Sequence, residues 1–96
     1  MNKVWLMLVE EDYFYDEKFT RVLCFSDKRS AKEYFEVFVQ AMLIDLENDY
    51  DADDEFKFED DIDIDYYSDN TGVCLYMEDA YNIDIHLEEQ EVITIK

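Results

Sequence analysis

The sequence predicts an α+β domain, in which an antiparallel sheet of four to six strands carries one long helix on one face. Three observations lead to this prediction. Several segments have the length and the apolar or alternating pattern of strands. One segment in the first half of the chain repeats its apolar residues with a helical period instead. The 96 residues include no proline and one glycine, and 49% are hydrophobic, which predicts a single compact domain over residues 1–96.

The first two strands are predicted at residues 4–9 and 19–25. The first, VWLMLV, is apolar at every position, which is typical of a central strand covered on both faces. The second, FTRVLCF, is rich in β-branched and aromatic residues, so the two predict a hairpin with a long acidic loop, EEDYFYDE. The first apolar run is too short for a signal peptide core or a membrane span. We therefore expect no membrane interaction and a cytoplasmic location.

A long helix is predicted from Ser26, a good N-cap residue, to about residue 48. Its apolar side chains form a broad stripe that includes Phe38 and would cover the sheet. Val37 and Ile44 widen the apolar arc beyond what one sheet face could bury. Either a loop or a second subunit would cover the excess, so a homodimer through the helix is an open alternative.

Further strands are predicted at residues 61–67, 73–77 and 81–87. The segment SDNTG offers Asn70 and Gly72 for the positive φ angles of a hairpin. The tail EEQEVITIK could add a short final strand at an edge of the sheet.

The acidic side chains are most concentrated in residues 49–65, DYDADDEFKFEDDIDID, with ten carboxylates and one lysine in seventeen residues. Isoleucine alternates with aspartate in DIDID, and YNIDIHL repeats this alternation. If both strands turn their isoleucines toward the helix, the opposite face carries Asp61, Asp63, Asp65 and Asp84. Like charges on one face cost stability, which indicates a functional surface. The predicted partner-binding residues are Asp49, Asp51, Asp53, Asp54, Glu55, Glu59, Asp60, Asp61, Asp63, Asp65, Tyr67 and Asp84.

The net charge of −19 is unevenly distributed along the chain. Residues 1–32 hold six acids and six bases, whereas residues 33–96 hold the other twenty-one acids with only Lys57 and Lys96. This charge repels phosphate, which excludes nucleic acid as a direct ligand and disfavours an anionic membrane. The expected partner is a basic protein surface, including one built to hold nucleic acid.

No pattern in the sequence indicates catalysis. There is no glycine-rich phosphate loop, no serine nucleophile elbow, no metal-ligand cluster and no paired catalytic carboxylate. We predict no enzyme activity, no catalytic residues and no cofactor. Cys24 and Cys74 are isolated in apolar runs and are predicted to be reduced core residues.

Asp49, Asp51 and Asp53 resemble the opening of a calcium-binding loop, D-x-D-x-D. The sixth and twelfth positions hold Asp54 and Asp60 in place of the usual glycine and glutamate. No specific metal site is predicted, and a calcium- or ion-binding domain is kept as an alternative.

A compact, highly acidic, proline-free domain with its charge on one surface resembles the nucleic-acid-mimic inhibitors of phages and mobile elements, the anti-CRISPR and anti-restriction proteins. The segments that carry the resemblance are DYDADDE, EDDIDID and YNIDIHL. It implies a non-enzymatic phage protein in the host cytoplasm that occupies the nucleic-acid channel of a defence nuclease complex. Carboxylates would replace phosphates, and aromatic rings would replace bases. An immunity protein that neutralises a nuclease toxin through the same surface is the alternative.

Overall fold

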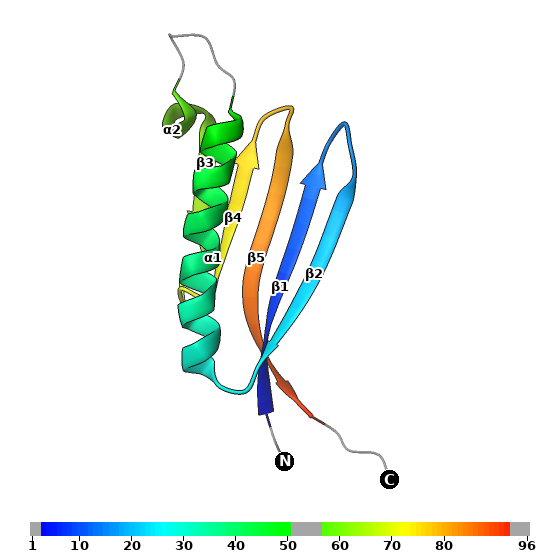
Figure 1. The fold of residues 1–96 in the computed structure, drawn as a ribbon, viewed down its shortest axis with the longest axis vertical. Helices are drawn as coiled ribbons and strands as arrows, with labels where there is room; N and C mark the ends of the chain where they lie inside the picture. Colours follow the sequence, from blue (N-terminus) through cyan, green and yellow to red (C-terminus); the bar gives the residue numbers. More distant parts are fainter. Residues whose placement is uncertain (1–2, 51–56, 93–96) are drawn as a thin grey trace.

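The computed structural model describes residues 3–50 and 57–92. One long helix packs on one face of a five-stranded antiparallel sheet (Figure 1), which confirms the predicted α+β fold class. No helix in the described part of the chain has the length and apolar character needed to span a membrane. The elements are β1 (Lys3–Tyr13), β2 (Lys18–Phe25), α1 (Lys28–Asp49), α2 (Phe58–Asp61), β3 (Ile62–Tyr66), β4 (Gly72–Met77) and β5 (Tyr81–Glu91).

The strand order is β2–β1–β5–β4–β3, and every neighbouring pair is antiparallel. The last of the described strands, β5, is therefore the central strand of the sheet. The prediction that the tail adds a separate edge strand is wrong for residues 88–91. These residues continue β5, and they pair with β1 as far as Glu91 opposite Lys3. Residues 93–96 lie outside the described residues.

The predicted hairpin of β1 and β2 is confirmed, but its loop is shorter than expected. Residues 10–13, predicted to lie in an acidic loop, belong to β1. Glu10 pairs with Thr20 of β2 on one side and with Asp84 of β5 on the other. Because two neighbouring strands satisfy the backbone here, the acidic residues are held in extended conformation.

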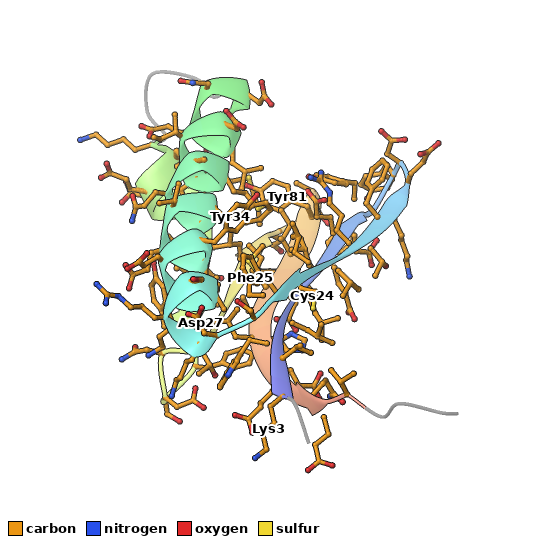
Figure 2. All side chains as sticks on the ribbon, turned by 60° about the horizontal axis from the view of Figure 1, so that its bottom comes forward. Lys3, Cys24, Phe25, Asp27, Tyr34 and Tyr81 are labelled. Carbon is orange, nitrogen blue, oxygen red and sulfur yellow. The ribbon has the colours of Figure 1, made fainter. Side chains whose placement is uncertain are left out.

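The helix α1 begins after Asp27, one residue later than predicted. Asp27 has extended backbone angles, and its Oδ1 accepts a hydrogen bond of 2.8 Å from the backbone N–H of Ser30, which is the geometry of an N-cap. The Ser30 donors also hold the pKa of the Asp27 carboxyl below its ordinary value of 3.8. The hydroxyl of Ser26 donates a hydrogen bond to the carboxylate of Asp27, so Ser26 is not itself the N-cap residue. Asp27 lies at the start of the helix in Figure 2.

The hydrophobic core lies between α1 and the sheet. Helix residues Ala31, Phe35 and Val39 are buried there, and Phe38 is half-buried beside them. Figure 2 shows Phe25 and Tyr81 between the sheet and the helix. The fully buried strand side chains are Met7, Val9, Val73, Leu75, Ile83 and Ile85.

Strand β1 has a neighbour on each side, but only one of its faces is covered by described residues. Met7 and Val9 are fully buried under α1, whereas Leu6 and Leu8 point to the opposite face and are half-buried. The predicted cover on both faces is therefore wrong for the described part of this chain, because its one long helix lies on one side. We call the sheet face opposite α1 the open face.

The hairpin between β3 and β4 uses one of its two predicted turn residues as expected. Asn70 has a φ of 59°, in the left-handed region. Gly72 does not have a positive φ. It begins β4 beneath the ring of Tyr67, where an added Cβ would lie 2.7 Å from the ring carbon Cδ2. The glycine is required by this close approach rather than by the turn.

Candidate protein-binding face

A row of polar side chains crosses the acidic part of the open face from one sheet edge to the other. In strand order it consists of Thr20, Glu10, Asp84, Cys74 and Asp65, each paired in register with the next. Neighbouring strands lie about 4.8 Å apart, so Glu10 and Asp84 are adjacent and Asp65 is about 10 Å beyond Asp84. Three carboxylates therefore share one row.

A second row lies two residues further along the strands, at a distance of about 6.6 Å. It consists of Lys18, Asp12, Asn82, Tyr76 and Asp63. The Nζ of Lys18 lies 3.7 Å from Oδ2 of Asp12, which forms an exposed ion pair. Among the described strand positions on the open face, Lys18 is the one lysine or arginine.

The two rows define what we call the acidic half of the open face: Glu10, Asp12, Asp63, Asp65 and Asp84. Duplex DNA carries about four phosphate charges over about 6.6 Å of its axis, since one charge falls every 1.7 Å. The five carboxylates span a similar length along the strands, so their charge density is comparable with that of a duplex. No single strand provides this density, because carboxylates on one strand are about 6.6 Å apart.

Tyr67 lies over the acidic half and fixes the orientation of Asp84. Its hydroxyl donates a hydrogen bond of 2.8 Å to Oδ1 of Asp84, and its ring stacks on His86 with 6.3 Å between centroids. Burial and the hydrogen bond to Asp84 raise the pKa of Tyr67 to about 12. The phenol therefore stays a neutral donor at physiological pH, and Tyr67 remains 37% exposed beside the carboxylates.

The two cysteines both lie on the open face, one in the acidic half and one outside it. Cys74 is half-buried between Asp84 and Asp65. Burial, followed by the charges of these two carboxylates, raises the pKa of its thiol. Cys24 is exposed on the edge strand β2, and Cys74 also lies outside the core, so the predicted core position is wrong for both cysteines. Cys24 alternates with Leu23 and Phe25, which point toward the helix. Both cysteines are free thiols.

Asp61 does not join the carboxylate row, which corrects the prediction that residues 61, 63 and 65 alternate on one strand. It is the last residue of α2, and its carboxylate accepts a hydrogen bond from the hydroxyl of Tyr50. The ring of Tyr50 in turn contacts that of buried Phe58, with 5.6 Å between centroids. Because the helical turn of α2 precedes β3, strand alternation starts only at Ile62.

The other predicted partner-binding residues fall into three groups. Asp63, Asp65, Tyr67 and Asp84 come together on the open face. Asp49 ends α1, and Glu59 and Asp60 are exposed on α2, which lies beside the end of α1 (Figure 1). Asp51, Asp53, Asp54 and Glu55 lie outside the described residues, as does most of the calcium-loop pattern.

Glu10 and Asp12 are not among the predicted partner-binding residues, yet they lie in the acidic half because β1 extends beyond its apolar run. A signal for them exists in the sequence. Leu6, Leu8, Glu10 and Asp12 keep a period of two, so they share one face of an uninterrupted strand. The cluster of acidic and aromatic residues after Val9 instead suggested a loop.

A buried carboxylate lies on the covered face of the sheet, but it is fully partnered. Glu11 is 5% exposed. Its side chain accepts a hydrogen bond of 2.9 Å from the hydroxyl of Tyr13 and lies 3.4 Å from the guanidinium of Arg21. These contacts account for the burial of Glu11 and indicate a structural role.

The outward side of α1 carries exposed apolar residues, as the helical period predicted. Val37 is 68% exposed and Ile44 is 57% exposed. The homodimer that these residues suggested stays a prediction.

No known family model, curated protein or solved structure matches this chain. The fold and the site themselves define its class: an acidic α+β domain whose sheet is covered by a helix on one face and carries clustered carboxylates on the other.

Proposed function

We propose that this protein is a non-enzymatic inhibitor that mimics nucleic acid and blocks the nucleic-acid-binding surface of a defence nuclease complex, of the anti-CRISPR or anti-restriction type. The observation that supports the proposal most is the acidic half of the open face, where five carboxylates lie in two adjacent rows with one lysine. These carboxylates take the place of phosphates opposite the lysines and arginines of the target. The exposed ring of Tyr67 offers a stacking surface in place of a base.

The clustering of charge favours a binding role over a role in solubility alone. Glu10 and Asp84 are directly opposite each other on neighbouring strands, an arrangement that destabilises a sheet. Solubility would be served equally by carboxylates spread over the surface. A basic partner that covers this face relieves the repulsion, so the strain in the free protein contributes to binding.

The inhibitor acts in two steps under this proposal. The net charge of −19 steers the protein toward a basic channel and accelerates the encounter. Carboxylates in the two rows then form charge-assisted hydrogen bonds with lysine and arginine side chains that would otherwise hold phosphates. Nucleic acid is excluded because it needs the same cations. The place of action is the cytoplasm of the host cell, where such complexes work.

The test compares two triple variants with the same change in net charge. The row variant carries Glu10→Gln, Asp65→Asn and Asp84→Asn on the open face. The control variant carries Glu33→Gln, Glu36→Gln and Glu47→Gln, which lie exposed on α1. The target is first captured from host extract and identified by mass spectrometry. Competition with labelled nucleic acid for the purified target is then measured at low and at physiological salt.

We expect the row variant to compete at least about tenfold less well than the wild-type protein, because several target cations lose their partners. The salt dependence of its binding should also be weaker. The control variant should lose only the small general contribution of net charge. Equal competition by the row variant and the wild type at both salt concentrations would contradict the proposal, as would a captured target that binds no nucleic acid.

A further inference from the structure

A second, apolar region lies beside the acidic half on the open face. It consists of Val4, Leu6, Leu8, Val22 and Cys24, which we call the apolar half. Leu8 pairs in register with Val22, and Leu6 pairs with Cys24, so these side chains form a continuous patch across β1 and β2. Val22 is 56% exposed, and Leu6 and Leu8 are half-buried.

The apolar pattern of β1 indicates that a further layer packs on this patch. All six residues from Val4 to Val9 are apolar, a pattern typical of strands buried on both faces. Within the described residues, α1 covers one face only, and the other face is left without a layer. Exposed aliphatic side chains that form a contiguous patch mark interaction surfaces.

Charge decides which kind of partner fits. The apolar half adjoins the acidic half directly, because Leu8 is followed two residues later by Glu10 on the same strand face. A second copy of this chain would bring another net charge of −19 and would press carboxylates against each other or against aliphatic side chains. A partner with apolar side chains beside lysines or arginines satisfies both halves together.

We propose that the apolar half is the anchor of the interface, and that the partner is a basic protein whose apolar side chains lie next to its lysines and arginines. The inference rests on the proposed function, since it assigns the same partner to the same face. It adds that recognition is not purely electrostatic. A free polycation should bind weakly and lose its affinity in salt, whereas a partner with apolar side chains should keep much of its affinity.

The two cysteines allow each half of the face to be followed separately. Cys24 is exposed in the apolar half, and Cys74 lies in the acidic half between Asp84 and Asp65. Alkylation by iodoacetamide, followed by mass spectrometry, gives the reaction rate of each thiol. A bound partner slows the reaction of the cysteine that it covers. Each rate is compared with that of the same cysteine in the unbound protein, so their different intrinsic reactivities cancel.

The probes are two synthetic peptides of equal positive charge. One joins a run of leucines to a run of lysines, and the other has serines in place of the leucines. Binding is measured by fluorescence anisotropy at low and at physiological salt. The variants are Leu8→Thr with Val22→Thr on the open face, and Val37→Thr as a control of matched chemistry at an exposed site on α1. Val22→Thr alone serves if the double variant fails to fold, because Val22 lies exposed on an edge strand.

We expect the leucine peptide to bind at least about tenfold more tightly than the serine peptide, a difference that burial of one or two aliphatic side chains supplies. The open-face variant should reduce this difference several-fold, and Val37→Thr should leave it unchanged. The leucine peptide should protect both cysteines, and the serine peptide should protect Cys74 alone.

Two contrary results are distinguishable. In the first, both peptides protect Cys74, neither protects Cys24, and the two peptides bind with equal affinity. The apolar half is then not the anchor of the interface, but the acidic half still binds cations as the proposed function requires. If neither cysteine is protected by either peptide, the open face is not the binding face, and the proposed function fails with the inference.

Discussion

The two faces of the sheet are formed by the same strands, yet they differ in almost every physical property. The covered face buries aliphatic side chains under α1 and one carboxylate among the described residues, Glu11, which has two partners. The open face carries six carboxylates on its strands, the five of the acidic half and Glu88, with one lysine, beside aliphatic side chains that no described element covers. Because side chains alternate along a strand, one set of positions can provide stability while the next provides recognition. This division of roles between the two faces can be tested by substitution.

The largest difference is expected between two neighbouring residues of β5. Ile83 is fully buried on the covered face, so Ile83→Ala should lower the free energy of unfolding by about 2 to 5 kcal/mol. Asp84 lies on the open face, so Asp84→Asn should change the free energy of unfolding by less than about 0.5 kcal/mol. Urea unfolding of the two variants measures both values. Similar losses in the two variants would mean that the open face also contributes to the core.

A smaller effect is expected for Glu11, compared with its neighbour Glu10. Glu11→Ala removes a buried acceptor and leaves Tyr13 and Arg21 without it, which should cost about 1 to 3 kcal/mol. Glu10→Ala takes a carboxylate from the open face and removes its repulsion with Asp84, so no loss is expected. Thermal unfolding of the two variants provides the measurement. The division fails here if Glu10→Ala is the more damaging change.

Alkaline pH should act on the covered face through its tyrosines. Burial raises the pKa of Tyr81 to about 12, and burial with the hydrogen bond to Glu11 raises that of Tyr13 to about 12, from an ordinary value of 10.0. A raised pKa in the folded state means that the stability of these groups is fully present below pH 10 and is lost as the pH rises toward about 12. Melting temperatures across this range should fall, and Tyr81→Phe should reduce the fall. An unchanged alkaline transition in Tyr81→Phe would contradict this assignment.

The smallest effect is expected from screening of the net charge. Repulsion among carboxylates limits stability, so moderate salt should raise the melting temperature. Acid should lower the stability through Asp27 and Asp69, because hydrogen bonds hold the pKa of each carboxyl below 3.8 in the folded state. Their contribution is lost as the pH falls through those lowered values. A melting temperature that drops on adding 0.3 M NaCl would count against this prediction.

The fold class and most of the elements follow from local patterns in the sequence. Its periods of two and 3.6 residues placed a helix between two groups of strands, and the alternation in IDID and YNIDIHL placed Asp63, Asp65 and Asp84 on the face opposite the isoleucines. These features are local, since side-chain direction follows from backbone period alone. The N-cap differed by one residue, from Ser26 to Asp27, because both can accept the hydrogen bond and only the backbone geometry selects one.

The tertiary structure decided which strands are neighbours and which faces are covered. Pairing of β1 with β5 put Glu10 beside Asp84, a contact between residues that are far apart in the chain. The short helix α2 removed Asp61 from the row, and the edge position of β2 exposed Cys24. The continuous apolar run of β1 predicted cover on both faces, whereas the described residues cover only one. The sequence of a strand shows that a face is apolar, but it does not show what packs against that face.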